Sequence, residues 1–196
     1  MVCVCLRRGE QVFGKIVQVL LLAIGLVMTG HAVLTPMLIV IVMITGDFLA
    51  MSLTTDRVRP SVRPNSWNVG RITGAAVVLG LCFLAFCVAI LTVGRLELRL
   101  GIEALRTLCA VAIVYGSQAT IYALRARRYL WGLGPTKRLV LSSTADVLII
   151  TVLASRGIEM APLPLSVLAG ELVGAAVFGV ILDGVKIPVL ARFKIS

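Results

Sequence analysis

The sequence predicts an all-α membrane protein, a polytopic bundle of six transmembrane helices with both termini in the cytoplasm. Of its 196 residues, 59% are hydrophobic and 14% are charged, and the mean hydropathy is +1.05. Soluble domains are far more polar. Several apolar runs reach or approach the roughly 18 residues that cross a bilayer. The net charge of +10 comes from cations beside these runs, which favours membrane topology over nucleic-acid binding.

The first two spans are predicted to form a tight hairpin. A tail of residues 1–10 precedes span one, at about 11–33, and span two covers about 36–53. The short polar turn at His31 returns span two as an antiparallel neighbour of span one. From Pro36 span two has about 18 residues and a length of about 27 Å, close to the hydrocarbon thickness.

Four further spans complete the predicted transport domain, residues 11–186. They lie at about 72–92, 104–124, 139–154 and 165–182, and a cytoplasmic tail, 187–196, follows. The 139–154 span is short, but Arg138 and Arg156 at its ends can snorkel.

The cations predict which side of the membrane each loop occupies. With six spans, fifteen of the nineteen lie on the face that holds both termini. The four on the opposite face are Arg95, Arg99, Arg106 and Arg156. The positive-inside rule therefore places both termini in the cytoplasm.

Asp47 is the principal candidate site residue because it puts a carboxylate inside an apolar span. Such a residue costs about 2.5 to 3.5 kcal/mol on insertion scales, so an ion or proton site is the favoured interpretation. Thr45 and Gly46 precede it and offer polar support. The alternative is a neutral carboxyl group that is hydrogen-bonded for packing.

Three other polar residues in the spans are candidates for supporting roles. Asp146 follows a serine-rich stretch and serves either an ion pathway or interhelical hydrogen bonding. Glu171 lies in Gly170-x-x-x-Gly174, which favours close helix packing, with a second polar relay as the alternative. Gln118 can support the bundle through amide hydrogen bonds.

The remaining features call for no ligand. The loop from Arg57 to Arg71 carries ordinary positive-inside charge, or binds anionic lipid or a cytosolic domain. Trp67, Tyr129 and Trp131 fit an interfacial aromatic belt. Five cysteines and one histidine show no ligand spacing, so no metal site and no disulfide framework is predicted.

The stretch that contains Asp47 resembles the sixth transmembrane helix and following loop of P-type cation-pumping ATPases, most closely the plasma-membrane proton pumps. The matching residues are Pro36, Asp47, Asp56-Arg57-Val58, Pro60-Ser61, Pro64 and Ser66-Trp67. Further matches are Ser117-Gln118-Ala119, then Arg125 and Arg127, with the family's eighth helix, and Asp183, Lys186 and Arg192 with the end of its tenth. The resemblance implies helices five to ten of a pump in the plasma membrane, with Asp47 as the proton acceptor.

The predicted function is therefore the membrane transport domain of a P-type proton or other cation ATPase, without the nucleotide-binding and phosphorylation domains. The sequence has no Asp-Lys-Thr-Gly-Thr, Thr-Gly-Glu-Ser or Gly-x-x-x-x-Gly-Lys motif, so whether the protein acts as an enzyme stays open. No cofactor is expected in this chain, and ATP and Mg²⁺ are expected only for a complete pump. The expected partners are the lipid bilayer, a proton or other cation and the missing cytosolic domains.

Three alternatives stay open. A passive cation carrier or channel would use Asp47 and Asp146, but the inverted repeat typical of carriers is not evident. A non-transporting truncated remnant is the second alternative. A membrane enzyme of lipid metabolism is the least favoured, because no paired cytosolic aspartate motif is present.

Overall fold

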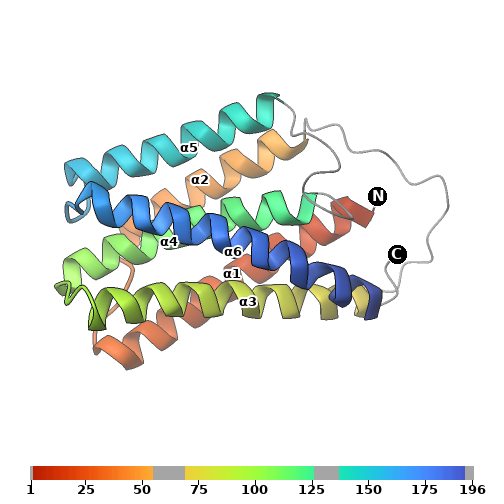
Figure 1. Ribbon diagram of the computed structural model, residues 1–196, viewed down its shortest axis with the longest axis horizontal. Helices are drawn as coiled ribbons and strands as arrows, with labels where there is room; N and C mark the ends of the chain where they lie inside the picture. The colour runs from red at the N-terminus through yellow and green to blue at the C-terminus, as the bar shows by residue number, and fades with distance from the viewer. Residues whose placement is uncertain (1, 55–68, 126–136, 193–196) are drawn as a thin grey trace.

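The described part of the chain forms a bundle of six α-helices that run alternately up and down (Figure 1). The computed structural model describes residues 2–54, 69–125 and 137–192, with side chains for 14–47, 73–123, 137 and 139–189. The helices are α1 (Val2–Thr29), α2 (Pro36–Thr54), α3 (Val69–Leu96), α4 (Ile102–Arg125), α5 (Lys137–Arg156) and α6 (Leu165–Arg192). No strand occurs within those ranges, so the all-α prediction is confirmed there.

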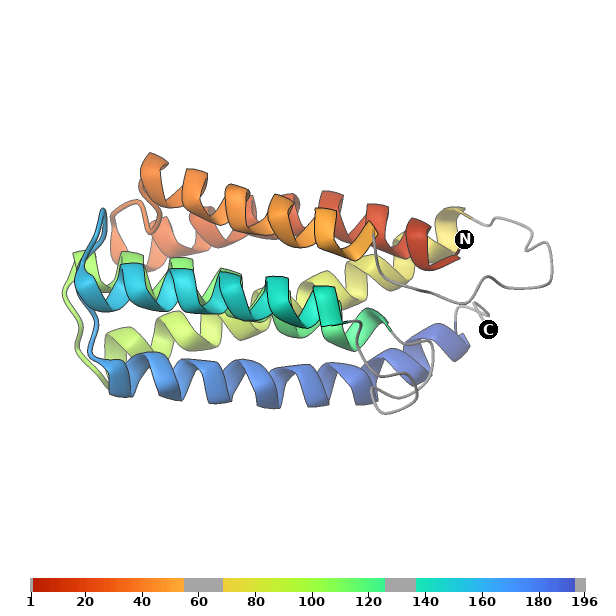
Figure 2. The ribbon, with the colours of Figure 1, turned by 90° about the horizontal axis from the view of Figure 1, so that it is seen from above.

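Among the residues that the structure describes, four helices are long and apolar enough to cross a membrane. These segments are Thr73–Leu96, Ile102–Ala123, Leu139–Arg156 and Leu165–Val189. In α1 and α2 the side chains are described only over part of each helix, and the apolar segments within that part are Gly14–Thr29 and Pro36–Asp47. The beginning of α1 and the end of α6 lie at the same end of the bundle (Figures 1 and 2), as an even number of antiparallel helices requires.

Two helices extend beyond the predicted spans. α1 already begins at Val2, so most of the predicted N-terminal tail is helical, and α6 continues to Arg192. α6 continues beyond Leu182, the predicted end of the span, because the charged residues that follow pair with each other inside the protein. Lys186 forms an ion pair with Asp183 one turn away, and both are buried.

The turn between α1 and α2 is built by local capping. Gly30 follows the last residue of α1 with φ of 72° and donates its N–H to the Leu26 carbonyl, the left-handed ending that glycine permits. Thr35 caps α2 by accepting the Leu38 N–H at 3.4 Å. Pro36 then occupies the first helical position, where its missing N–H costs nothing.

The two helices of this hairpin separate instead of packing along each other. α1 packs mainly against α3, whereas α2 packs against α4 and α5. The antiparallel return was predicted correctly, but the close pairing of spans one and two was not. The turn residues Val33 and Leu34 are buried in the same core as α4, and Arg106 of α4 holds the turn by donating to the Ala32 carbonyl at 2.9 Å.

α4 is the central helix of the bundle and contacts every other helix. Within its membrane-length segment 72% of the residues are buried, against 33% in each of α3, α5 and α6. α4 is also the least apolar of these four segments. Lipid solvates apolar side chains well, so the more polar helix is accommodated inside and the more apolar helices outside.

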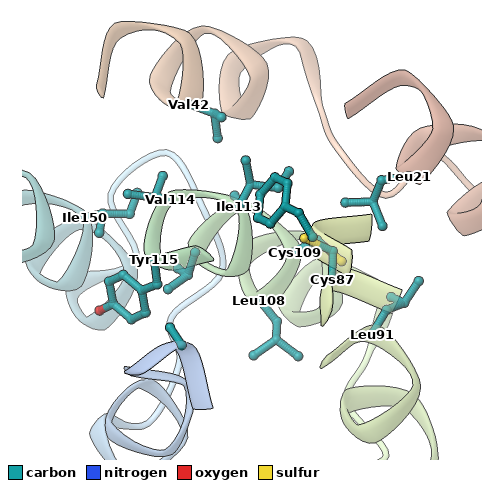
Figure 3. Packing of buried hydrophobic residues seen from close by; sticks show 14 of the residues in the cluster. Leu21, Val42, Cys87, Leu91, Leu108, Cys109, Ile113, Val114, Tyr115 and Ile150 are labelled. Atoms are coloured by element: carbon teal, nitrogen blue, oxygen red, sulfur yellow. The ribbon is translucent and has the colours of Figure 1, made fainter. Parts of the chain in front are cut away.

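A large apolar core surrounds α4 (Figure 3), and a smaller cluster forms where Leu139 packs against Ile121 and Tyr122. Phe178 of α6 stacks on Phe86 of α3 with ring centroids 4.6 Å apart. Cys87 and Cys109 are free, buried thiols whose sulfur atoms lie close together in Figure 3. They pack as small apolar groups, as predicted.

Close helix contact occurs at glycines other than the predicted pair. A Cβ at Gly116 would lie 2.5 Å from the Phe83 ring, and one at Gly179 would lie 3.3 Å from the Cβ of Ala119. Gly170 is exposed with nothing within 4 Å of its Cβ position. The prediction of close packing at Gly170 was therefore wrong, because Glu171 points inward and turns its neighbour, about 100° around the helix, to the outside.

Candidate functional site

Asp47 lies on the exposed face of α2. The residues on the same side of the helix, Val40, Met43 and Ile44, are also exposed, at 48%, 41% and 63%. The opposite side is buried against α4 and α5. Asp47 is about 16 Å along the helix from Pro36, and it points away from the interior of this bundle.

The residues before Asp47 do not contact its carboxylate. Thr45 is buried and donates its hydroxyl hydrogen to the carbonyls of Ile41 and Val42, both at 3.1 Å. This back-bonding satisfies the hydroxyl within α2 itself. Gly46 is half-buried with nothing within 4 Å of its Cβ position. Neither Thr45 nor Gly46 therefore forms a polar site with Asp47 in this structure.

A hydrogen-bonded group connects α4 to α5. Gln118 donates its amide to Asp146 Oδ2 at 3.2 Å and accepts the Ser143 hydroxyl at 2.8 Å. All three side chains are buried. The spacing of Ser143 and Asp146 puts both on one face of α5, so a single amide on α4 reaches them together. Two of the predicted supporting residues thus meet each other in the interior, whereas Asp47 lies on the exposed face of α2.

A second polar pair lies further along the same interface and was not predicted. The Tyr115 hydroxyl is 2.6 Å from the Thr151 hydroxyl, and Thr151 also donates to the Val147 carbonyl. Tyr115 precedes Gln118 by three residues and Thr151 follows Asp146 by five, so both pairs face the α4–α5 contact. Isolated Tyr and Thr residues in apolar spans give no sequence signal that they meet.

Glu171 lies on the other side of α4, within α6. Its side chain is 4% exposed, and neither carboxyl oxygen has a hydrogen-bond partner among the described residues. It is close enough to Cys87, Cys109 and Tyr115 to interact with them electrostatically.

A buried ion pair lies nearer the carboxyl end of α6. Lys186 is completely buried, lies 2.5 Å from Asp183, and donates to the Ala123 carbonyl of α4. The carbonyl belongs to the last turn of α4, where helix carbonyls lack intrahelical donors and carry partial negative charge. The sequence marked these residues only as a match to a helix end, so their burial was not anticipated.

The described candidate residues therefore lie in separate parts of the bundle and do not form a single cluster. Asp146 and Glu171 lie on different sides of α4, Asp183 is paired with Lys186, and Asp47 is outside. Within the described residues no group of three or more His, Cys, Asp or Glu side chains could hold a metal ion. The predicted loop from Arg57 to Arg71 and the aromatic residues at 67, 129 and 131 lie outside the described side chains.

These features define an integral membrane protein with buried polar contacts between helices. Comparison with curated proteins adds a functional direction: the chain is 27% identical over 164 residues to a Methanocaldococcus jannaschii protein named "Putative cation-transporting ATPase MJ1226". The match covers 83% of this chain and 20% of that protein. The chain thus spans about one fifth of the length of the relative it matches. No family model matches the chain.

Proposed function

We propose that this chain is the membrane-embedded transport domain of a P-type cation pump, with Asp47 as its ion-binding carboxylate. The similarity to a segment of a protein named as a cation-transporting ATPase supports the class. The four membrane-length helices support the location in a bilayer. The finer proposal is six spans in the plasma membrane, both termini cytoplasmic, and a proton as the most favoured ion.

The position of Asp47 is the observation that carries the proposal. A carboxylate at the middle of an apolar helix is costly against lipid, by about 2.5 to 3.5 kcal/mol on insertion scales. Asp47 nevertheless lies on an exposed, otherwise apolar face of α2. A further helix of a longer pump would cover this face and convert an exposed carboxylate into one wall of an interhelical ion site.

The same position argues against a passive carrier made from this bundle alone. Such a carrier would line its pathway with acids that face one interior channel, and Asp47 and Asp146 were the expected pair. Asp146 is buried at the α4–α5 contact while Asp47 faces outward from α2. A pathway between the two would have to pass through the packed contact between these helices.

Transport in this proposal depends on domains that this chain does not supply. ATP hydrolysis in the cytosolic domains would rearrange the spans and alter the surroundings of Asp47. The affinity of a carboxylate for a proton or cation changes when its burial and its partners change. The chain contributes the ion-binding carboxylate and the helices that move it.

The test is the conservative change Asp47→Asn in the chain rejoined to the remaining domains of a cation-transporting ATPase. Asn keeps the size of the side chain but cannot ionise, so we expect normal insertion and loss of ATP-driven flux in vesicles. Glu97→Gln is the matched control, because Glu97 is exposed at the end of α3. Flux near the parent level in the Asp47 variant, at equal protein amounts, would refute the assignment of Asp47.

A further inference from the structure

Glu171 is a buried acidic side chain, and no described residue forms an ion pair with it. Its helix, α6, packs against α4 and α3. The titratable groups close enough to interact with it electrostatically are Cys109 and Tyr115 from α4 and Cys87 from α3, and the Tyr115 hydroxyl itself is directed to Thr151 of α5. None of these is cationic. Lys186 is fifteen residues further along the same helix, about 22 Å away, and is already paired with Asp183.

The carboxyl group also lacks hydrogen-bond donors. Both oxygens are buried without a partner among the described residues. An ionised carboxylate in such surroundings would lose its hydration and regain nothing, whereas the neutral acid loses much less. A side chain kept only for packing has no need of an acid at this position. Asp146 shows the contrast, because its carboxylate accepts a hydrogen bond from Gln118.

We propose that Glu171 is a buried proton-binding site of the bundle, separate from Asp47, and that it carries its proton in the arrangement described above. Loading transfers one proton from hydronium to a carboxylate oxygen and releases water, and unloading reverses this transfer. Because α3, α4 and α6 exclude water from the carboxyl group, exchange requires these helices to separate. The site does not depend on the ion-binding role of Asp47.

The geometry favours a proton over a metal ion as the ligand. Thiolates bind soft cations and carboxylates bind hard ones, yet no set of three such groups among the described residues is arranged to hold a metal ion. A proton needs only a single oxygen and no coordination sphere. The tight enclosure of the site therefore suits the smallest cation.

Infrared spectroscopy of the purified chain in lipid vesicles tests the proposal directly. A neutral carboxyl group gives a C=O stretch well separated from carboxylate bands. We expect this band at neutral pH in the parent chain, and we expect it to lose intensity in Glu171→Gln. Glu103→Gln is the matched control, because the Glu103 side chain is 72% exposed and paired with Arg106. The control should leave the band unchanged.

Two further variants assign the band even if Glu171→Gln does not fold. The band must persist in Asp146→Asn and in Asp47→Asn, since Glu171 keeps its proton in both variants. Absence of the band from the parent chain would overturn the proposal, as would its loss in either of these variants or its survival in folded Glu171→Gln. The measurement needs no ATPase domain, so its outcome is independent of the proposed pump function.

Discussion

Removing the buried ammonium group in Lys186→Met is expected to destabilise the bundle strongly. Lys186 and Asp183 lie 2.5 Å apart, with 1% and 9% of their side chains exposed. At an effective dielectric constant of about 20, two unit charges at this distance attract by about 7 kcal/mol. Removing both charges from water costs several kcal/mol per ion. The attraction between the two charges therefore roughly offsets the cost of their dehydration.

The single variant removes the Lys186 ammonium group from its contact with the buried Asp183 carboxylate. Breaking a buried pair in this way costs about 3 to 5 kcal/mol, whereas replacing both partners by apolar side chains of similar volume is often neutral or stabilising. We therefore expect Lys186→Met combined with Asp183→Leu to recover most of the loss. A double-mutant cycle should then give a coupling free energy above about 2 kcal/mol.

The assay is reversible unfolding of the purified chain in mixed micelles, followed by far-ultraviolet circular dichroism as the fraction of denaturing detergent rises. Glu103→Gln is the control, because it breaks the exposed pair with Arg106 and should cost less than about 1 kcal/mol. A cost for Lys186→Met as small as that of the control would refute the reasoning. The pair would then be hydrated instead of buried.

The remaining two predictions concern packing and topology. Gly116→Ala should destabilise the bundle by about 1 to 3 kcal/mol, because its Cβ would lie 2.5 Å from the Phe83 ring. Gly170→Ala is the control and should change the free energy of unfolding little or stabilise α6. Equal effects of the two variants in the same unfolding assay would contradict the packing described. Cysteines placed singly at Ser61 and Ile158, in a cysteine-free background, should react with a membrane-impermeant reagent from opposite sides of the membrane, and labelling from one side only would contradict six spans.

The supporting residues differ in how far the sequence could place them. The prediction that Asp146 and Gln118 form hydrogen bonds between helices was one of the alternatives left open, and the two side chains do bond to each other. The Gly-x-x-x-Gly spacing around Glu171 predicted close helix packing at Gly170, and this prediction was wrong because nothing lies within 4 Å of the Gly170 Cβ position. A Gly-x-x-x-Gly spacing shows that two small residues share a face, but only the rotation of the helix decides whether that face meets another helix.

The sequence by itself determined the membrane class and the existence of all six helices, because hydropathy, helix length and an end signal such as Pro36 are local properties of the chain. Only the tertiary structure decided that α4 is central and that Asp47 faces outward from α2. α2 is apolar on every side, so its pattern specifies no inward stripe, and its rotation follows from packing against α4 and α5. The meeting of Lys186 with the Ala123 carbonyl was equally beyond the sequence. Residues 63 positions apart form a hydrogen bond only when their two helices lie side by side, and no local sequence pattern predicts which helices do so.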